Sequence, residues 1–515
     1  MFRALLLLSL CALALTALPA CGGDPTTGAP PDWGGNSIQP GGSGPRQGSG
    51  GEIGSAIAQP GPHVLDVEDV RTMNFPVRIV ETDGTVREIA SPDELTALLR
   101  AEQEPRVGPE LGPGVAARPA IEYVRLFYAT DRAREAPGWG TVLAPLLPSV
   151  LAFLGALVLT RLLLRWLKDE VRRVAYVVGA LVLIASGGFV ARGVMLSLET
   201  LRLSQTTDVI YGSQRSASGG LELGTVIVSI PAQNHEIARI ELPSLLKGEV
   251  FPDPTRHFAI HGVHPVAREG YFDALRQAVE ASPGREACVF VHGYNNTFAY
   301  AAMRLAQIVY DVGFEGAPIL YSWPSKGAVA LYTHDKENAD WSAGNLAGFL
   351  GDLREQSGAE HIHLLAHSMG SRVLSTAMMQ AVPATPEGEE AIFSELILAA
   401  PDLDADTFER FIAPELLKRT RRVTLYASER DEALLASVQV NGQRRAGMAG
   451  DGIVLVAGMD TVDVTNVAGG HAYIADSGRV LTDLVEIVKH RRSADERSAL
   501  TPRERDDERY WEMER

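Results

Sequence analysis

Cysteine is scarce in this chain, which contains only Cys11, Cys21 and Cys288 among its 515 residues. Cys11 lies in an N-terminal apolar run, and Cys288 lies in a run that is typical of a buried strand. Three such cysteines cannot build a disulfide framework, and no Cys/His spacing of the zinc-binding kind accompanies them. The histidines are dispersed over expected strands and loops. We therefore expect neither a metal nor a cofactor.

Positive charge is also in short supply. The chain has 47 Lys and Arg against 64 Asp and Glu, for a formal net charge of −17. Nucleic-acid-binding surfaces concentrate basic residues, and no basic patch with interleaved aromatics is present. We expect no nucleic-acid partner. The length allows two to four domains, or one large domain with insertions, and we find no internal repeat.

The N-terminus has the features of an export signal. Residues 1–21 have one arginine, an apolar run too short for a comfortable membrane span, and small residues at the end, which predicts a secretory signal peptide. Its end, Leu18-Pro19-Ala20-Cys21, resembles the lipobox of bacterial lipoproteins, although Pro19 departs from that pattern. Cleavage nearby or an uncleaved anchor are the alternatives to lipidation of Cys21. Residues 22–62 are rich in Gly, Pro and Ser and predict a flexible spacer.

A small accessory segment is expected at 63–120. Residues 75–90 alternate around Thr82-Asp83-Gly84 and predict a hairpin. Ser91-Pro92-Asp93-Glu94 predicts a helix start, with a serine cap, proline at the first helical position and glutamate three residues after the cap. We find no candidate chemistry in this segment, which is either an accessory unit or an extension of the main domain.

Two long uncharged runs predict a membrane hairpin at 139–203, inserted between a first part of the main domain at 121–138 and its body at 204–492. Trp139–Thr160 and Val174–Ala191 are both long enough to span a bilayer, the second reaching Leu198 if Arg192 snorkels. The loop between them has more basic than acidic residues, which predicts a cytoplasmic position. We therefore expect a protein of the bacterial inner membrane with everything after the hairpin on the periplasmic side.

Strand and helix patterns alternate through most of 204–492, which predicts an α/β fold with a mostly parallel sheet covered on both faces. The early strands follow one another without helices and predict an antiparallel edge. The charged tail 493–515 is expected to be disordered or an exposed helix. The expected strands are 121–131, 223–230, 258–263, 287–291, 318–322, 361–366, 396–400, 423–427 and 462–467, and the expected helices are 270–281, 297–312, 337–355, 370–382, 406–417 and 478–490.

A candidate nucleophile lies between the strand at 361–366 and the helix at 370–382, in Ala366-His367-Ser368-Met369-Gly370. A strand, sharp turn and helix with a serine at the tip is the arrangement of a nucleophile elbow. The residues two before and two after the serine must be small, and Ala366 and Gly370 meet that requirement. The backbone N–H of Met369 would lie at a helix N-terminus, where it can stabilise an oxyanion.

A serine needs a base, and the base needs a carboxylate to orient it. Only His471 and His490 follow the serine. His471 follows an expected strand end, whereas His490 lies among basic residues of an expected helix, so we predict His471 as the base. For the acid we predict Asp431, which follows the preceding strand, with Asp404 or Asp402 in the loop before as alternatives.

A second oxyanion donor is expected in the loop after the strand 287–291, which reads His292-Gly293-Tyr294. Gly293 permits close approach of the backbone, and the Tyr294 N–H is the predicted donor. We interpret His292 as a structural residue beside the site. By alternation along the strand, His367 is expected to point to the opposite side of the tip and to serve in packing.

Seven motifs together resemble a bacterial family of esterase/lipase-like alpha/beta hydrolases of largely unknown function. They are FYATDR (127–132), YGSQRS with LGTVIVSIP (211–231), VFVHGYNNTF (289–298), YSWPSKG (321–327), AHSMGSR (366–372), APDLDADTF (400–408) and LYASERDEAL (425–434). The resemblance implies the alpha/beta-hydrolase fold and a Ser-acid-His triad on Ser368, His471 and one of the aspartates. It implies no substrate. The inserted membrane hairpin departs from the family pattern.

These patterns predict a membrane-anchored serine hydrolase that acts on an acyl ester, with a small-molecule or lipid ester as substrate and membrane lipids as its surroundings. The suggestion of a lipid substrate rests only on location. One alternative is an acyltransferase with the same triad. The other is a non-catalytic envelope scaffold that binds a partner with a hydrolase fold. Nothing in the sequence indicates an oligomeric state.

Overall fold

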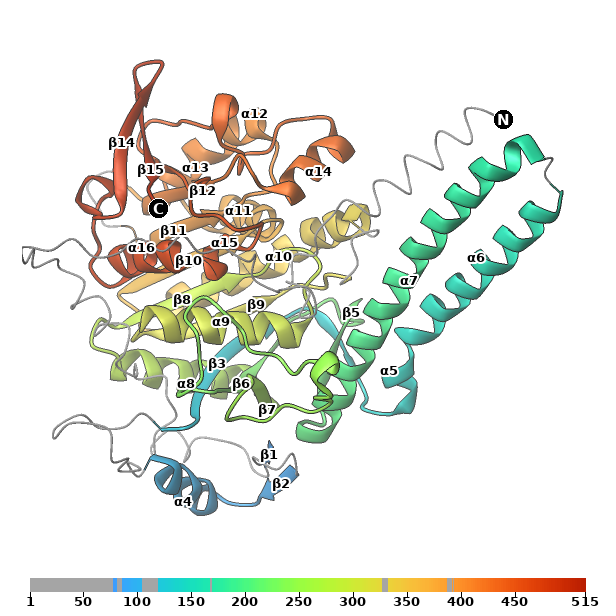
Figure 1. The fold of residues 1–515 in the computed structure, drawn as a ribbon. Helices are drawn as coiled ribbons and strands as arrows, with labels where there is room; N and C mark the ends of the chain where they lie inside the picture. The colour runs from blue at the N-terminus through green and yellow to red at the C-terminus, as the bar shows by residue number, and fades with distance from the viewer. Residues whose placement is uncertain are drawn as a thin grey trace, which may run out of the picture.

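The computed structural model describes residues 77–80, 86–103, 119–166, 169–326, 332–386, 391 and 393–515. The expected signal peptide at 1–21, the proposed lipidation site Cys21 and the spacer at 22–62 lie outside the described residues. The main features of the described chain are a large sheet with helices on both faces and a long helical pair that projects from it (Figure 1).

The sheet has eleven strands, and its central part is parallel as predicted. Strands β3, β9, β8, β10, β11, β12, β13 and β15 are parallel neighbours in that order. Antiparallel strands β6 and β7 extend one edge, and β14 extends the other. Across the sheet the strands are β14 (Leu500–Arg505), β15 (Glu508–Met513), β13 (Asp460–Asp463), β12 (Thr420–Ala427), β11 (Phe393–Ala399), β10 (His361–His367), β8 (Glu286–Val291), β9 (Ala317–Ser322), β3 (Glu122–Thr130), β6 (Glu222–Ile230) and β7 (Ala259–Pro265).

Two hydrophobic cores sandwich the sheet because its central strands are apolar on both faces. Along β8, Val289 and Val291 face one core and Phe290 faces the other. Helices α8 (Arg268–Ala281), α10 (Tyr332–Gln356) and α11 (Gly370–Ala381) cover the first face, and α9 (Phe298–Val312) and α16 (Gly478–Val488) cover the second. This arrangement confirms the predicted fold class.

The tail prediction is wrong, because residues 500–513 form a β-hairpin at the sheet edge rather than a disordered segment or a helix. Asp506 and Asp507 both have positive φ, 52° and 65°, as a tight hairpin turn requires. Trp511 and Met513 are buried and alternate with charged residues. From Trp511 onward, the charged residues therefore lie on one face of the strand, and Trp511 and Met513 on the other face pack on the domain.

Other elements of the main domain also differ from expectation. Helix α14 (Glu432–Asn441) was not predicted. The expected helix at 406–417 is broken into α12 (Ala405–Thr407), a π-helical turn (Phe408–Ile412) and α13 (Ala413–Leu417). Strand β13 ends at Asp463, because the chain then turns, with a hydrogen bond of 2.9 Å from Val467 N–H to the Val464 carbonyl.

The insertion between 135 and 210 forms a helical hairpin, as predicted. Its base is a two-stranded antiparallel sheet of β4 (Arg132–Glu135) and β5 (Ile210–Arg215). From there α5 (Trp139–Leu143) and α6 (Leu146–Trp166) lead outward and α7 (Asp169–Thr206) returns (Figure 1). Residues 139–166 and 175–206 are apolar enough to cross a membrane, and most of their surface is not covered by protein.

The accessory segment packs on the domain edge. β1 (Val77–Val80) and β2 (Val86–Ile89) pair antiparallel, which confirms the predicted hairpin strands. Helix α4 (Pro92–Gln103) begins as predicted, with Ser91 Oγ accepting from Glu94 N–H at 3.3 Å. Ile79, Ile89 and Leu95 join a small core with residues of β3 and β6.

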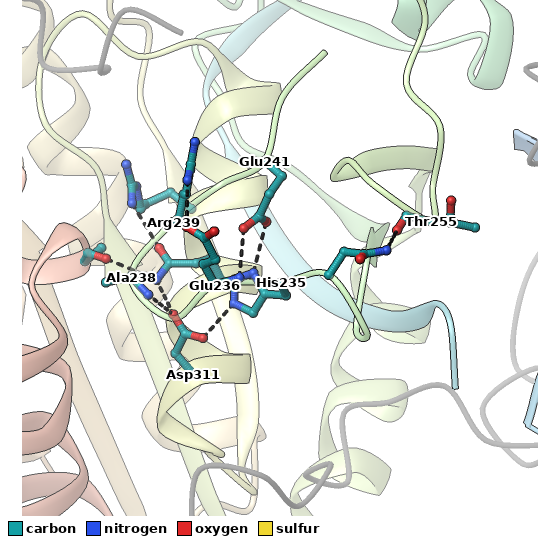
Figure 2. A network of polar contacts seen from close by, with 11 residues as sticks. His235, Glu236, Ala238, Arg239, Glu241, Thr255 and Asp311 are labelled. Atoms are coloured by element: carbon teal, nitrogen blue, oxygen red, sulfur yellow. Dashed lines mark hydrogen bonds and ion pairs between the residues drawn. The ribbon is translucent and has the colours of Figure 1, made fainter. Parts of the chain in front are cut away.

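The long connection between β6 and β7 (231–258) is fastened to α9 by a buried charge cluster (Figure 2). His235 lies 2.8 Å from Asp311 of α9 and 3.0 Å from Glu241. Asp311 also accepts from Ala238 N–H and from Gln307. Burial lowers the pKa of His235, but the hydrogen bonds from its ring to Asp311 and Glu241 outweigh burial and raise the pKa to about 9. The cluster therefore holds the 231–258 connection, which has little secondary structure of its own, against α9.

Candidate active site

Ser368 occupies a sharp turn between β10 and α11, as the sequence predicts. Its φ is +53°, a left-handed conformation that costs a non-glycine residue about 1–3 kcal/mol. A hydrogen bond to the neighbouring strand helps to hold this conformation: Ser368 N–H donates to the Ala399 carbonyl at 2.9 Å. A Cβ on Gly370 would lie 2.4 Å from the Val291 carbonyl oxygen, so only glycine fits there. Ser368 is 2% exposed and therefore buried.

Asp431 and His471 are in contact. His471 Nδ1 lies 2.7 Å and 2.8 Å from the two Asp431 carboxylate oxygens, so Nδ1 carries the proton and donates. Asp431 follows β12 and also caps α14, accepting from Leu434 N–H at 3.0 Å. His471 follows β13. Both side chains are buried, so their hydrogen bond is shielded from competing water.

The two alternative acids are engaged elsewhere. Asp402 is buried in an ion pair with Arg445 at 2.7 Å and also accepts from Ser437 and Tyr332. Asp404 caps α12, accepting from the N–H and hydroxyl of Thr407 at 2.8 and 2.6 Å. Of the three aspartates considered, the structure brings Asp431 to His471.

The loop of His471 lies against the elbow. His367, which precedes Ser368, donates from Nε2 to the His471 carbonyl at 3.0 Å, and the two rings are 4.7 Å apart. His367 therefore does not point away from the site, as alternation along the strand suggested. The positive φ at Ser368 interrupts the regular strand, so alternation does not carry through the tip. Burial lowers the pKa of His367 to about 3, which keeps its ring neutral. His490 is exposed at the end of α16.

The loop after β8 packs on Ser368. A Cβ on Gly293 would lie 3.0 Å from Ser368 Cβ, so the missing side chain allows the close approach. The Gly293 carbonyl accepts from His292 Nδ1 at 2.7 Å and from Asn296 Nδ2 at 3.1 Å. A trans peptide directs its N–H opposite to its carbonyl, so these bonds fix the direction of the Tyr294 N–H. Met369 precedes the first residue of α11, at the helix N-terminus.

Arg132 is a component of the site region that was not among the predicted site residues. It is 1% exposed and joins three segments. Its guanidinium donates to Ser322 Oγ at 2.8 Å, to the Gly212 carbonyl at 3.0 Å and to the Asn296 carbonyl at 2.8 Å. Burial lowers the pKa of Arg132 to about 10, and Asp335 and Asp131 partly offset this effect. Arg132 is the last residue of the FYATDR motif, and its place there is the sequence feature that could have identified it.

His292 has the structural role that was expected for it. Its Nδ1 donates to the Gly293 carbonyl, so Nε2 is the acceptor that faces Arg132 and Ser322 at 3.3 and 3.2 Å. The ring stacks on Trp323, with the two planes 13° apart. Burial, together with the charge of Arg132, lowers the pKa of His292 well below its usual value. His292 is therefore a neutral spacer between the Arg132 network and the loop that holds Tyr294.

Within the described ranges, no group of three or more His, Cys, Asp or Glu side chains is arranged to hold a metal ion. A cavity of about 760 Å³ lies between α7, the 231–258 connection and the start of α9. Neither Ser368 nor His471 lines it, and Asn295 and Thr297 are its contacts with the loop after β8. This cavity and the candidate chemistry are therefore neighbouring but separate features.

Comparison with known proteins agrees with this fold. Residues 270–490, from α8 to the end of α16, match the family described as alpha/beta hydrolase of unknown function (DUF900). The matched stretch contains the elbow, the loop after β8, Asp431 and His471. No curated protein was found to match the chain. The chain has the alpha/beta-hydrolase fold, with two apolar helices inserted before the matched stretch.

Proposed function

We propose that this chain is a serine hydrolase of carboxylic esters, held at a bacterial inner membrane with its hydrolase domain on the periplasmic side. The observation that carries the proposal is the contact of 2.7 Å between His471 and Asp431, on a loop packed against the strained Ser368. A buried carboxylate, a histidine and a serine at an elbow are the parts that acyl transfer through a covalent intermediate needs.

In the proposed mechanism, Ser368 Oγ attacks the ester carbonyl carbon while His471 Nε2 takes the hydroxyl proton. Asp431 orients the ring and stabilises its positive charge. The negative charge that develops on the carbonyl oxygen is held by the N–H groups of Met369 and Tyr294. His471 then gives its proton to the leaving alcohol. Water repeats the sequence on the acyl-enzyme, releasing the carboxylic acid and restoring Ser368.

The membrane placement is part of the proposal. It is supported by the length and low polarity of α6 and α7 and by their exposed apolar surface. α6 has 21 residues, or about 32 Å at 1.5 Å per residue, close to the thickness of a bilayer core. Lipidation at Cys21 would add a second anchor on the same side of the membrane as the domain.

The proposal is tested by fluorophosphonate labelling of membranes that carry the full-length protein. We expect wild type to be labelled and Ser368→Ala not to be. Ser375→Ala is the matched control, because Ser375 is a buried serine of α11, the helix that follows Ser368, and its hydroxyl has no partner within the described part of the chain. Folded wild type without labelling would count against an activated serine and favour a binding role. Product analysis with an added alcohol then separates hydrolysis from acyl transfer.

A further inference from the structure

The cavity beside α7 has the size and lining of a binding site. Its volume of about 760 Å³ lies within the range of small-molecule sites, roughly 300–1,000 Å³. Most of its wall is apolar, including Val194, Met195, Leu203, Leu242 and Met303. One wall belongs to the 231–258 connection, which the contacts of His235 with Asp311 and Glu241 hold against α9 (Figure 2).

The cavity overlaps the end of the paired helices that lies nearer the domain. A Cβ on Gly179 would meet Thr160, and one on Gly193 would meet the Pro145 carbonyl at 2.9 Å, so α6 and α7 run side by side up to Gly193. Beyond this point α7 continues into the domain as far as Thr206. The lining along α7 extends from Gly188 to Thr206. The cavity therefore reaches from the end of the expected span that is nearer the domain into the domain itself.

Two buried donors at this cavity have unmet hydrogen-bonding capacity. Asn295 is 4% exposed, and its Oδ1 accepts from Arg192 Nη2 at 2.6 Å, which fixes the amide orientation. The Asn295 Nδ2 then has no partner among the described residues. Arg202 donates from Nε to the Val250 carbonyl at 2.7 Å, but its buried Nη2 likewise lacks a partner in the described chain.

Unmet buried donors are costly, and an acceptor bound in the cavity would satisfy this pair. Arg192 and Arg202 place two positive charges in the lining, against one negative charge at Glu199. A ligand that complements this wall has an apolar chain and an anionic head. The bilayer that the apolar part of α7 is proposed to cross is a source of such molecules.

We propose that this cavity binds an acyl chain of an anionic membrane lipid, whose head group accepts hydrogen bonds from Asn295 and Arg202. A fatty-acid carboxylate and a phospholipid phosphate share this chemistry. The inference rests on the membrane placement proposed above and not on the hydrolase activity. Because Asn295 follows Tyr294 in the loop packed on Ser368, an occupant would be bound next to the proposed oxyanion donor.

The test is photo-crosslinking to the full-length Ser368→Ala protein in detergent micelles, which removes turnover from the experiment. The probes are a diazirine-bearing long-chain fatty acid, its methyl ester and a diazirine-bearing phosphatidic acid. We expect crosslinks to map to 188–206 and 242–246 for one or both anionic probes, and which probe labels identifies the head group. The methyl ester should label at least about tenfold less, equivalent to about 1.4 kcal/mol of lost binding free energy.

Two variants probe the site separately. Met303→Trp fills the cavity and Arg202→Gln removes the charged donor, and each should lower labelling by the anionic probes about tenfold. Leu157→Trp is the matched control, because Leu157 is an exposed apolar residue of α6 that does not line the cavity. Thermal unfolding checks that each variant is folded. Labelling spread evenly over α6 and α7, labelling by the methyl ester equal to that by the acids, or labelling insensitive to both variants would overturn the proposal.

Failure of this inference can be distinguished from failure of the proposed function. Fluorophosphonate labelling of wild type with no mapped lipid crosslinks would leave the hydrolase and remove the lipid site. Mapped crosslinks in a protein whose Ser368 never reacts would leave the lipid site and remove the hydrolase.

Discussion

Asp431 and His471 lie 40 positions apart in the chain, yet the Asp431 carboxylate is 2.7 Å from Nδ1 of His471. Both residues follow the carboxyl ends of neighbouring parallel strands, β12 and β13, which meet at one edge of the sheet. The contact between Asp431 and His471 depends on this strand order. Asp402 and Asp404 are bound to other partners, Arg445 and Thr407.

Asp431→Asn should lower the rate of ester cleavage by about 10⁴, because an amide no longer holds His471 in the required tautomer. Asparagine still caps a helix, so α14 should stay formed and the melting temperature nearly unchanged. The rate of fluorophosphonate labelling measures the effect. Asp404→Asn is the control and should react like wild type. An equal loss in both variants would mean that Asp431 is not the orienting acid.

Asn296→Ala should lower kcat by about tenfold to a hundredfold, somewhat less than removal of an oxyanion donor itself. The Asn296 amide donates to the carbonyls of Gly293 and Tyr294, so its loss frees the peptide that carries the Tyr294 N–H. Because the change acts on transition-state stabilisation, KM should hold while kcat falls. Asn466→Ala, whose side chain contacts Glu512 away from the site, is the control. A rise in KM at constant kcat would argue against this positioning role.

Arg132→Met should destabilise the fold by about 3–5 kcal/mol, since it leaves buried carboxylates such as Asp131 and Asp335 without their compensating charge. Denaturant unfolding measures the change. Arg132→Lys keeps the charge but loses the planar set of donors, so it should recover part of the stability and little of the Ser368 labelling. Full labelling in Arg132→Lys would show that the donor geometry does not matter to the site.

The His235 cluster should make stability depend on pH in the alkaline range. The His235 pKa is about 9 in the folded chain and about 6.5 in the unfolded chain, so the stabilisation is complete below pH 6.5 and disappears as pH rises through 9. The difference corresponds to a few kcal/mol at most. His235→Gln should flatten the unfolding free energy over this interval. An unchanged pH profile in the variant would mean that another group is responsible.

Met513→Ala should cost about 2–5 kcal/mol of unfolding free energy, because Met513 is fully buried in the core that the C-terminal hairpin closes. Glu508→Ala, an exposed substitution on the same strand, should change stability by less than about 0.5 kcal/mol. Denaturant unfolding of the two variants side by side makes the comparison. Equal stabilities would show that the hairpin is not part of the folded unit.

Much of the fold could be predicted because its signals are local. The apolar runs of β8 and β10, the helix cap at Ser91 and the small residues at 366 and 370 each depend on a few consecutive positions. The C-terminal hairpin escaped prediction because its charges dominate the composition of 493–515, whereas only Trp511 and Met513 show the buried face. Helix α14 escaped because its apolar residues form no amphipathic stripe: Leu434 is buried, whereas Leu435 and Val440 are exposed.

By itself the sequence determined the elbow around Ser368, most of the alternating strands and helices of the parallel sheet and the two long apolar helices, since chain-local sterics and hydrophobic periodicity specify these features. Tertiary structure alone decided which aspartate meets His471, where His367 lies and how Arg132 joins three motifs. It also decided that Arg192 of α7 meets Asn295, 103 positions away, beside an apolar cavity. Contacts of this kind depend on how separate elements pack against one another, and no local pattern in the chain encodes that packing.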